Sequence, residues 1–371
     1  MNKISLGTVS FTEETASFLN RICQTHRVGQ GEFIKRFENE LKNFFGVKHA
    51  IAVSNGTAAD AIALAACNYK NPQGKNEVIL PAMTFIAQAN AILEAGFKPV
   101  FVDVDDNYQV NVEQMESKIT DKTLALMPVH LFGKPANMAD IMKVAEKHKL
   151  PVIEDTCDAV GTKLEGRYVG TIGTAGCLSF YIAHTIAAGE GGAILTNDDE
   201  IADLARSLRN HGKKGNDLFG MFTFDVIGFS AKMNEMEAAV GLGATKVINE
   251  TIARRKYVLK YLNKELNNQF VEENGQEIVP HCYPILLKDR SSRNAAMEIL
   301  DSAGIEVRPH YPCLPTQTGA YAFLGHSLGE FPNSENLGER GLYVPSHQNI
   351  SEEELIYLKD KLAKVLEKYG H

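Results

Sequence analysis

The distribution of apolar residues from about residue 48 onward predicts strands alternating with helices. Several short runs rich in Val, Ile, Leu and Phe are apolar almost without interruption, as expected for a mostly parallel sheet covered on both faces. We predict strands within residues 48–56, 76–83, 98–105, 124–133, 150–157, 176–183 and 191–198, and helices within 57–67, 138–149 and 200–211. This order indicates a layered α/β fold.

The pattern changes near residue 240. Residues 248–270 form one long amphipathic stretch that predicts a helix, and two shorter α and β units follow it to the end of the chain. We therefore predict a large domain over residues 1–240 and a small C-terminal domain over residues 241–371.

Charge and cysteine usage narrow the class of protein. A net charge of −8 argues against nucleic acid and anionic membranes as partners, because both require clustered Lys and Arg. The N-terminal residues lack the apolar core of a signal peptide, and no apolar run is long enough to span a membrane. The six cysteines are scattered, without a C-x-C or C-x-x-C pair. These features predict a cytoplasmic protein without a metal site.

The segment SNGTAAD, residues 54–60, falls where a predicted strand turns into a helix. Gly56 permits a tight turn, and the backbone amide of Thr57 would point at a group placed on the helix N-terminus, which suits a phosphate. Because Asn-Gly is above all a turn signal, the motif alone also fits an ordinary turn.

The predicted strand in VIEDTCDAVG ends in acidic residues, Glu154, Asp155 and Asp158. Carboxylates at the C-terminal end of such a strand lie at the ligand-binding edge of an open α/β sheet. One interpretation is a helix N-cap. The other is a carboxylate that holds a pyridine nitrogen protonated, so that the ring accepts electrons.

Two further segments follow these motifs. In LSFYIAHTIAAGEGGAILTND a strand carrying Ser179 leads to His184 and then to a Gly-rich turn. Later, DVIGFSAKMNEMEAAVG predicts a loop that enters a helix. Together, the four segments and their order strongly resemble the DegT/DnrJ/EryC1/StrS family of sugar aminotransferases. The resemblance runs over nearly the whole chain, from residue 33 to residue 312.

The resemblance implies an aspartate aminotransferase-like fold (fold type I of pyridoxal phosphate enzymes), with a large three-layer domain, a mostly parallel sheet and a smaller C-terminal α/β domain. It also implies residue roles. Gly56, Thr57 and Ser179 match phosphate ligands, Phe85 matches the aromatic that stacks on the pyridine ring, Asp155 matches the partner of the pyridinium nitrogen, and Asp158 lies near the ring hydroxyl, where Gln or Glu is more usual.

The chain departs from the family pattern in the loop GFSAKM. Ser230 stands where the family usually has an Asn that reaches the cofactor phosphate of the neighbouring subunit, and Lys232 replaces an Arg. The resemblance implies a homodimer with shared active sites. Since serine reaches less far than asparagine, we expect its contact with the phosphate to be longer, water-mediated or absent.

The second departure is His184, at the position of the lysine that binds pyridoxal phosphate covalently in aminotransferases. Histidine forms no stable Schiff base, but with a pKa near 6.5 it can act as a general base. The pattern SFY-x-x-H resembles the 4-keto-6-deoxyhexose 3-dehydratases within the family. That resemblance implies a nucleotide-linked sugar substrate and non-covalently bound pyridoxamine phosphate or pyridoxal phosphate. Because the scattered cysteines include no closely spaced set, we expect no iron–sulphur cluster, and the chain then resembles the cluster-free type, which uses glutamate as amino donor.

Two alternatives stay open at this point. The chain could be a nucleotide-sugar aminotransferase whose lysine has been replaced by His184, or a binding protein that has lost catalysis. Candidates for the sugar or diphosphate pocket are His211, Arg308, His310 and Tyr311.

Overall fold

The central sheet of the protein is mostly parallel, as predicted. The computed structural model describes residues 3–215, 222–267, 270–273 and 275–370. Isolated bridges join two groups of strands into the order β3-β2-β4-β5-β8-β9-β1, and β9 runs antiparallel to both of its neighbours. The strands are β1 (His49–Val53), β2 (Glu77–Pro81), β3 (Lys98–Val102), β4 (Thr123–Leu126), β5 (Ile153–Asp155), β8 (Ala175–Ser179) and β9 (Gly192–Thr196).

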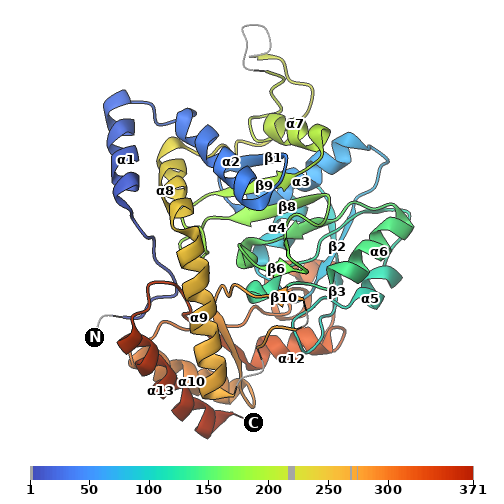
Figure 1. Cartoon of the computed structure of the whole chain (residues 1–371). Helices are drawn as coiled ribbons and strands as arrows, with labels where there is room; N and C mark the ends of the chain where they lie inside the picture. The colour runs from blue at the N-terminus through green and yellow to red at the C-terminus, as the bar shows by residue number, and fades with distance from the viewer. Residues whose placement is uncertain (1–2, 216–221, 268–269, 274, 371) are drawn as a thin grey trace.

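Helices cover both faces of this sheet, which explains why its strands are nearly continuous apolar runs. Successive side chains of a strand point to opposite faces. Ile51 and Val53 pack with α3 (Gly56–Lys70) and α7 (Asp199–Leu208), whereas Ala50 and Ala52 pack with α2 (Glu32–Phe45) and α8 (Glu235–Lys246). The result is the expected three-layer α/β arrangement (Figure 1).

The C-terminal part is built on a three-stranded antiparallel sheet, β11-β13-β12, with β11 at Tyr283–Leu286, β12 at Arg308–Pro309 and β13 at Gly341–Val344. The long helix α9 (Ile248–Leu266) runs from the large sheet toward α10 (Arg290–Ser302) and α13 (Glu352–Tyr369) (Figure 1). It ends before the predicted residue 270 because Asn267 takes a left-handed conformation with φ 49°. A domain boundary at residues 240/241 would cut α8, and this division remains a prediction.

The other described elements complete the chain. They are α1 (Glu13–Thr25), α4 (Ile86–Glu94), α5 (Val112–Ser117), α6 (Met138–His148), α11 (Leu314–Gln317), α12 (Pro332–Arg340), short strands β6 (Lys163–Leu164), β7 (Arg167–Tyr168) and β10 (Gln276–Glu277), and the 3-10 turns η1 (Leu131–Gly133), η2 (Cys157–Ala159) and η4 (Gly319–Leu324). Within the described ranges, no helix is both long enough and apolar enough to cross a membrane.

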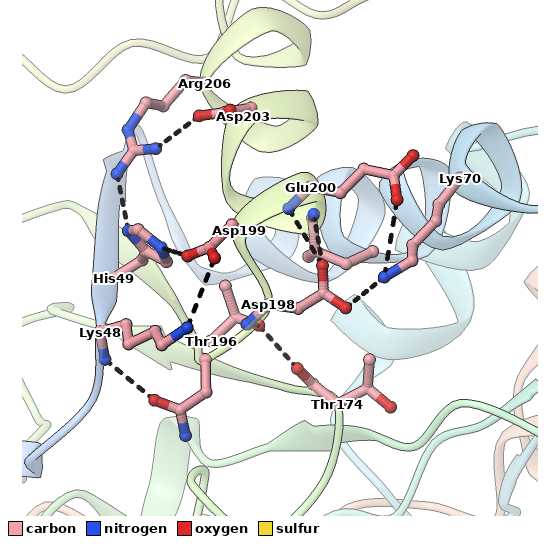
Figure 2. A network of polar contacts seen from close by, with 12 residues as sticks. Lys48, His49, Lys70, Thr174, Thr196, Asp198, Asp199, Glu200, Asp203 and Arg206 are labelled. Atoms are coloured by element: carbon pink, nitrogen blue, oxygen red, sulfur yellow. Dashed lines mark hydrogen bonds and ion pairs between the residues drawn. The ribbon is translucent and has the colours of Figure 1, made fainter.

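A polar network fixes the end of α3 that lies away from Gly56 (Figure 2). Lys70, in the last turn of α3, forms ion pairs with Asp198 and, at 3.7 Å, with Glu200. Asp198 caps α7 by accepting hydrogen bonds from the first-turn amides. Asp199 lies 2.7 Å from Nε2 of His49 on β1. The network therefore ties α3, α7 and β1 together.

Candidate active site

A cavity of about 670 Å³ opens at the C-terminal ends of β1, β5 and β8, within the size range of small-molecule sites. It is the place where an open α/β sheet binds its ligands. The structure brings most of the candidate residues together there: Gly56, Thr57, Phe85, Asp155, Asp158, Ser179 and His184 all line this cavity. Ser230 does not line it.

The start of α3 forms one wall of the cavity. Asn55 caps the helix through a 2.8 Å hydrogen bond from the amide of Ala58 to its side-chain oxygen. The first helical amides, at Gly56 and Thr57, have no partner within the helix, and their dipoles favour an anion. A Cβ at position 56 would lie 2.8 Å from Cβ of Ser179. Glycine thus lets the helix start reach the serine at the end of β8.

Asp155, at the end of β5, is 1% exposed. Gln88 of α4 donates a side-chain hydrogen bond to Oδ2, and the amide of Cys157 donates to Oδ1 at 2.8 Å. Thr84 in turn donates to Oε1 of Gln88 at 3.0 Å, which turns the amide nitrogen of Gln88 toward Asp155. Burial raises the pKa of Asp155, and the bonds from Gln88 and Cys157 oppose the rise.

Glu154 has a different role from that of its neighbour. Its side chain points to the other face of the strand and accepts hydrogen bonds from the amides of Gly170, Ile172 and Gly173 at 2.6–2.8 Å. Nε2 of His130 lies 3.1 Å from its Oε2. Glu154 therefore organises the loop before β8, and of the two adjacent carboxylates only Asp155 lines the cavity.

Asp158 follows β5 in the turn η2. Its Oδ2 accepts hydrogen bonds from the amide of Phe132 and from the hydroxyl of Tyr311, both at 3.3 Å. Burial raises the pKa of this carboxyl, and His184 lowers it. Tyr311 also contacts Phe85, with ring centroids 5.6 Å apart. Phe85 is 53% exposed, so its ring offers an open face at the cavity.

His184 lies in the turn after β8 and is 9% exposed. Burial lowers its pKa to about 3, with a further contribution from His281, and Asp158 opposes the shift. The expectation of a pKa near 6.5 was therefore wrong, because it took no account of burial. At neutral pH the imidazole of His184 is therefore uncharged, and one of its ring nitrogens carries a lone pair.

His281 is the main residue that the sequence analysis missed. Its Nδ1 lies 3.2 Å from Nδ1 of His184 and 3.8 Å from Oδ1 of Asp158, which is itself 4.0 Å from Nδ1 of His184. These three side chains are also close enough to hold a metal ion, but a hydrogen bond accounts for the histidine pair. The absence of a metal remains a prediction.

Asp60 was also missed, although a charged residue inside the apolar run of α3 was a visible signal. It is fully buried and lines the cavity, and neither of its oxygens has a hydrogen-bond partner among the described residues under the usual distance and angle limits. Burial raises its pKa, and the nearby Asp155 adds to the rise. No comparable local signal marked His281 or Gln88.

The remaining candidates divide into residues that line the cavity and residues that do not. Arg308 and Tyr311 line the cavity, whereas His211 and His310 are not among its lining residues. His310 is buried against position 341, where a Cβ would collide with its ring. Ser230 is exposed on the surface of its own chain and forms a bridge with Asn210. The proposed reach of Ser230 into a neighbouring site remains a prediction.

The cavity residues fit a pyridine cofactor that carries a phosphate. Three features suit the phosphate: a helix N-terminus with free amides, the hydroxyl of Ser179, and the glycine at position 56, where any Cβ would fill the space. The buried carboxylate of Asp155 suits a protonated ring nitrogen, which would lower the pKa of Asp155 again. Phe85 offers an aromatic face for the ring. The chemistry of these side chains therefore fits the group that the resemblance implied.

Comparisons with known proteins agree with this interpretation. The model of the DegT/DnrJ/EryC1/StrS aminotransferase family matches residues 10–363. GDP-perosamine synthase of Escherichia coli O157:H7 is 34% identical over 370 residues, covering 98% of both chains. The lipopolysaccharide biosynthesis protein RfbH of Salmonella typhimurium is 30% identical over 368 residues, covering 89% of this chain and 84% of that protein.

A solved structure extends the match to three dimensions. A DegT DnrJ EryC1 StrS aminotransferase from Brucella abortus is 30% identical, with a TM-score of 0.84 over 95% of this chain and 94% of that chain. Fold and cavity together define a pyridoxal phosphate-dependent enzyme of fold type I. The chain belongs to the DegT/DnrJ/EryC1/StrS aminotransferase family.

Proposed function

We propose that the protein removes the C3 hydroxyl of a nucleotide-linked 4-keto-6-deoxyhexose, using non-covalently bound pyridoxamine phosphate and glutamate as amino donor. The observation that carries the proposal is the identity of residue 184, five positions after Ser179. His184 lies where the cofactor lysine of an aminotransferase is expected, and no lysine is among the described residues that line the cavity. Among these described lining residues, the subunit therefore offers no side-chain primary amine that could bind the cofactor covalently.

When bound, the cofactor supplies an amino group that condenses with the sugar ketone and a ring that accepts electrons. Asp155 would hold the proton on the ring nitrogen, and Phe85 would cover one face of the ring. The phosphate would be bound by the amides of Gly56 and Thr57 and by the hydroxyl of Ser179. Asp158 would face the ring hydroxyl, in the orientation maintained by the hydrogen bond that the Tyr311 hydroxyl donates to its carboxylate.

His184 moves the proton. As a neutral imidazole it would take a proton from the C4′ carbon of the cofactor and deliver it to the departing C3 oxygen, which would leave as water. A lysine at the same position would instead bind the cofactor covalently and favour ordinary amino transfer. The single change from an amine to an imidazole therefore separates the two reactions.

The reaction balances without an iron–sulphur cluster. The sugar exchanges its C3 hydroxyl for hydrogen and keeps its ketone, a two-electron reduction. Glutamate becomes 2-oxoglutarate and its nitrogen leaves as ammonia, which is the matching two-electron oxidation. We further propose that the enzyme is a homodimer in which each site is completed by the neighbouring subunit, near Ser230.

The assay follows the products. Purified protein is incubated with pyridoxamine phosphate, glutamate and either a GDP- or a CDP-linked 4-keto-6-deoxyhexose, and nucleotide sugars and ammonia are measured by mass spectrometry and an enzymatic ammonia assay. Dehydration gives a sugar lighter by one oxygen atom and one ammonia for each sugar. His184→Lys is the matched control and should lose this product.

Amino transfer is the second candidate, because the relative from Escherichia coli is named GDP-perosamine synthase. It would give an amino sugar that keeps its C3 hydroxyl and would release no ammonia. That product from the unaltered protein would refute the dehydratase proposal. Binding of the nucleotide sugar without any product would indicate a binding protein.

A further inference from the structure

His184 and His281 form a buried pair in which the Nδ1 atoms of the two rings face each other. His281 precedes β11 and is 7% exposed, and its Nδ1 faces Nδ1 of His184 at 3.2 Å. A hydrogen bond between two such nitrogens needs one protonated and one unprotonated atom. The proton state of either ring at Nδ1 therefore fixes that of the other.

The backbone around both histidines is held by one side chain. Arg255 of α9 is 1% exposed. Its Nη1 donates to the carbonyls of Pro280 and His281 at 2.9 and 3.2 Å, and its Nη2 donates to those of Ala183 and His184 at 3.0 and 3.3 Å. One planar guanidinium thus fixes two loops that lie far apart in the sequence, and it sets the distance between the two rings.

The rings are uncharged and close to a carboxylate. Burial lowers the pKa of His281 to about 3, as it does for His184. Two neutral imidazoles can form this hydrogen bond between their Nδ1 atoms in only two ways. If His184 donates its Nδ1 proton, its Nε2 keeps the lone pair of a base, and if His281 donates, His184 carries its proton on Nε2. Oδ1 of Asp158 lies within 4.0 Å of both Nδ1 atoms, which favours positive charge on this pair when His184 takes up a proton.

We propose that His281 is a positioning residue for His184: it accepts the Nδ1 proton of His184 and so keeps Nε2 of His184 available as the nitrogen that takes the substrate-side proton. When Nε2 is protonated, the lone pair of His281 and the carboxylate of Asp158 stabilise the imidazolium. This inference rests on the proposed role of His184 as the proton-transferring group.

The tautomer of His184 tests the proposal directly. Enzyme loaded with pyridoxamine phosphate and labelled with ¹⁵N-histidine is studied by long-range ¹H–¹⁵N NMR, and the signals of His184 are identified by their loss in His184→Asn. We expect the Nδ1–H form in the unaltered protein. In His281→Leu we expect the Nε2–H form to appear, whereas His281→Asn keeps an acceptor near the original Nδ1 and preserves the Nδ1–H form.

Steady-state rates give a second readout. His281→Leu should lower kcat by roughly 10²-fold, within the range of losing a positioned general base, while KM changes less than about threefold. His281→Asn should recover most of kcat, and His281→Leu combined with His184→Asn should be no slower than His184→Asn alone. His347→Leu is the matched control, since His347 is also a buried histidine (5% exposed) but does not line the cavity.

The outcomes separate the two proposals. An Nε2–H tautomer of His184 in the unaltered protein, or an unchanged tautomer in His281→Leu, overturns the positioning role whatever reaction the enzyme performs. The predicted tautomers without dehydration products would leave the positioning role standing and refute the proposed function. If His281→Leu does not fold, the unaltered protein and His281→Asn still decide the question.

Discussion

Gly56 lies so close to Ser179 that a Cβ at position 56 would be 2.8 Å from the serine Cβ and 2.9 Å from Sγ of Cys157. Gly56→Ala should therefore push the start of α3 away from β8. We expect a loss of about 1–3 kcal/mol in the free energy of unfolding and weaker binding of pyridoxamine phosphate, measured by urea unfolding and by fluorescence titration. Gly319→Ala is the control, because a Cβ there meets nothing within 4 Å. Equal cofactor affinity in Gly56→Ala would contradict a phosphate site at this helix start.

The cofactor should leave the unaltered protein on dialysis, and borohydride should not fix it to the chain. His184→Lys is expected to gain a reducible covalent link, detected by intact-protein mass spectrometry. His184→Asn should keep cofactor affinity within about tenfold and lose roughly 10²–10⁴ in rate. A lysine adduct in the unaltered protein, or normal turnover by His184→Asn, would show that another residue performs these functions.

Asp155→Asn should slow the reaction by roughly 10²-fold or more, because an amide cannot hold the pyridine nitrogen protonated. The free energy of unfolding should be affected far less, because the substitution removes a buried charge. Glu154→Gln is the matched control on the other face of the strand. Because Glu154 accepts three backbone amides, its variant should lose stability rather than catalytic competence. Kinetics and thermal unfolding of both variants distinguish these effects.

Asp60→Asn should change how stability depends on pH. Burial raises the pKa of Asp60 in the folded protein, so the folded state binds more protons than the unfolded state between the ordinary and the raised pKa. The contribution of Asp60 to stability is then fully present at low pH and decreases as pH rises, by about 1.4 kcal/mol per pH unit in that window. Urea unfolding at pH 5 and pH 8 should show that the free energy of unfolding of Asp60→Asn, relative to that of the unaltered protein, increases as pH rises.

The exposed control for that experiment is Asp121→Asn, which removes a carboxylate from the surface. Its stability relative to the unaltered protein should vary little between the two pH values. A constant difference between Asp60→Asn and the unaltered protein would mean that Asp60 has an ordinary pKa in the folded state.

The dimer with shared sites is tested by complementation. Ser230→Trp should block the neighbouring site, and His184→Asn should inactivate its own. If each site combines both chains, a mixed dimer has one site with both changes and one with neither, so activity should reappear on mixing two inactive variants. An active monomer in sedimentation experiments, or no recovery despite demonstrated subunit exchange, would contradict the shared site.

The predictable part of the active site is the part carried by short continuous segments. Asp155 ends a buried strand, and Gly56 begins a helix directly after another, so their places at one edge of the sheet follow from the alternation of strands and helices. The same pattern predicted the two covered faces of the sheet. Ser179 and His184 share one segment, and their spacing carried the resemblance to the family.

Tertiary structure alone decided the surroundings of these residues. His281 lies 97 positions from His184 in the chain, and only the packing of the C-terminal part on the large sheet, with Arg255 between the two loops, brings the rings together. The pKa of about 3 at His184 likewise depends on burial, which is a property of the folded chain. Residue order along the chain determined the elements and the reactive groups, whereas their protonation depends on desolvation and long-range contacts that no local pattern contains.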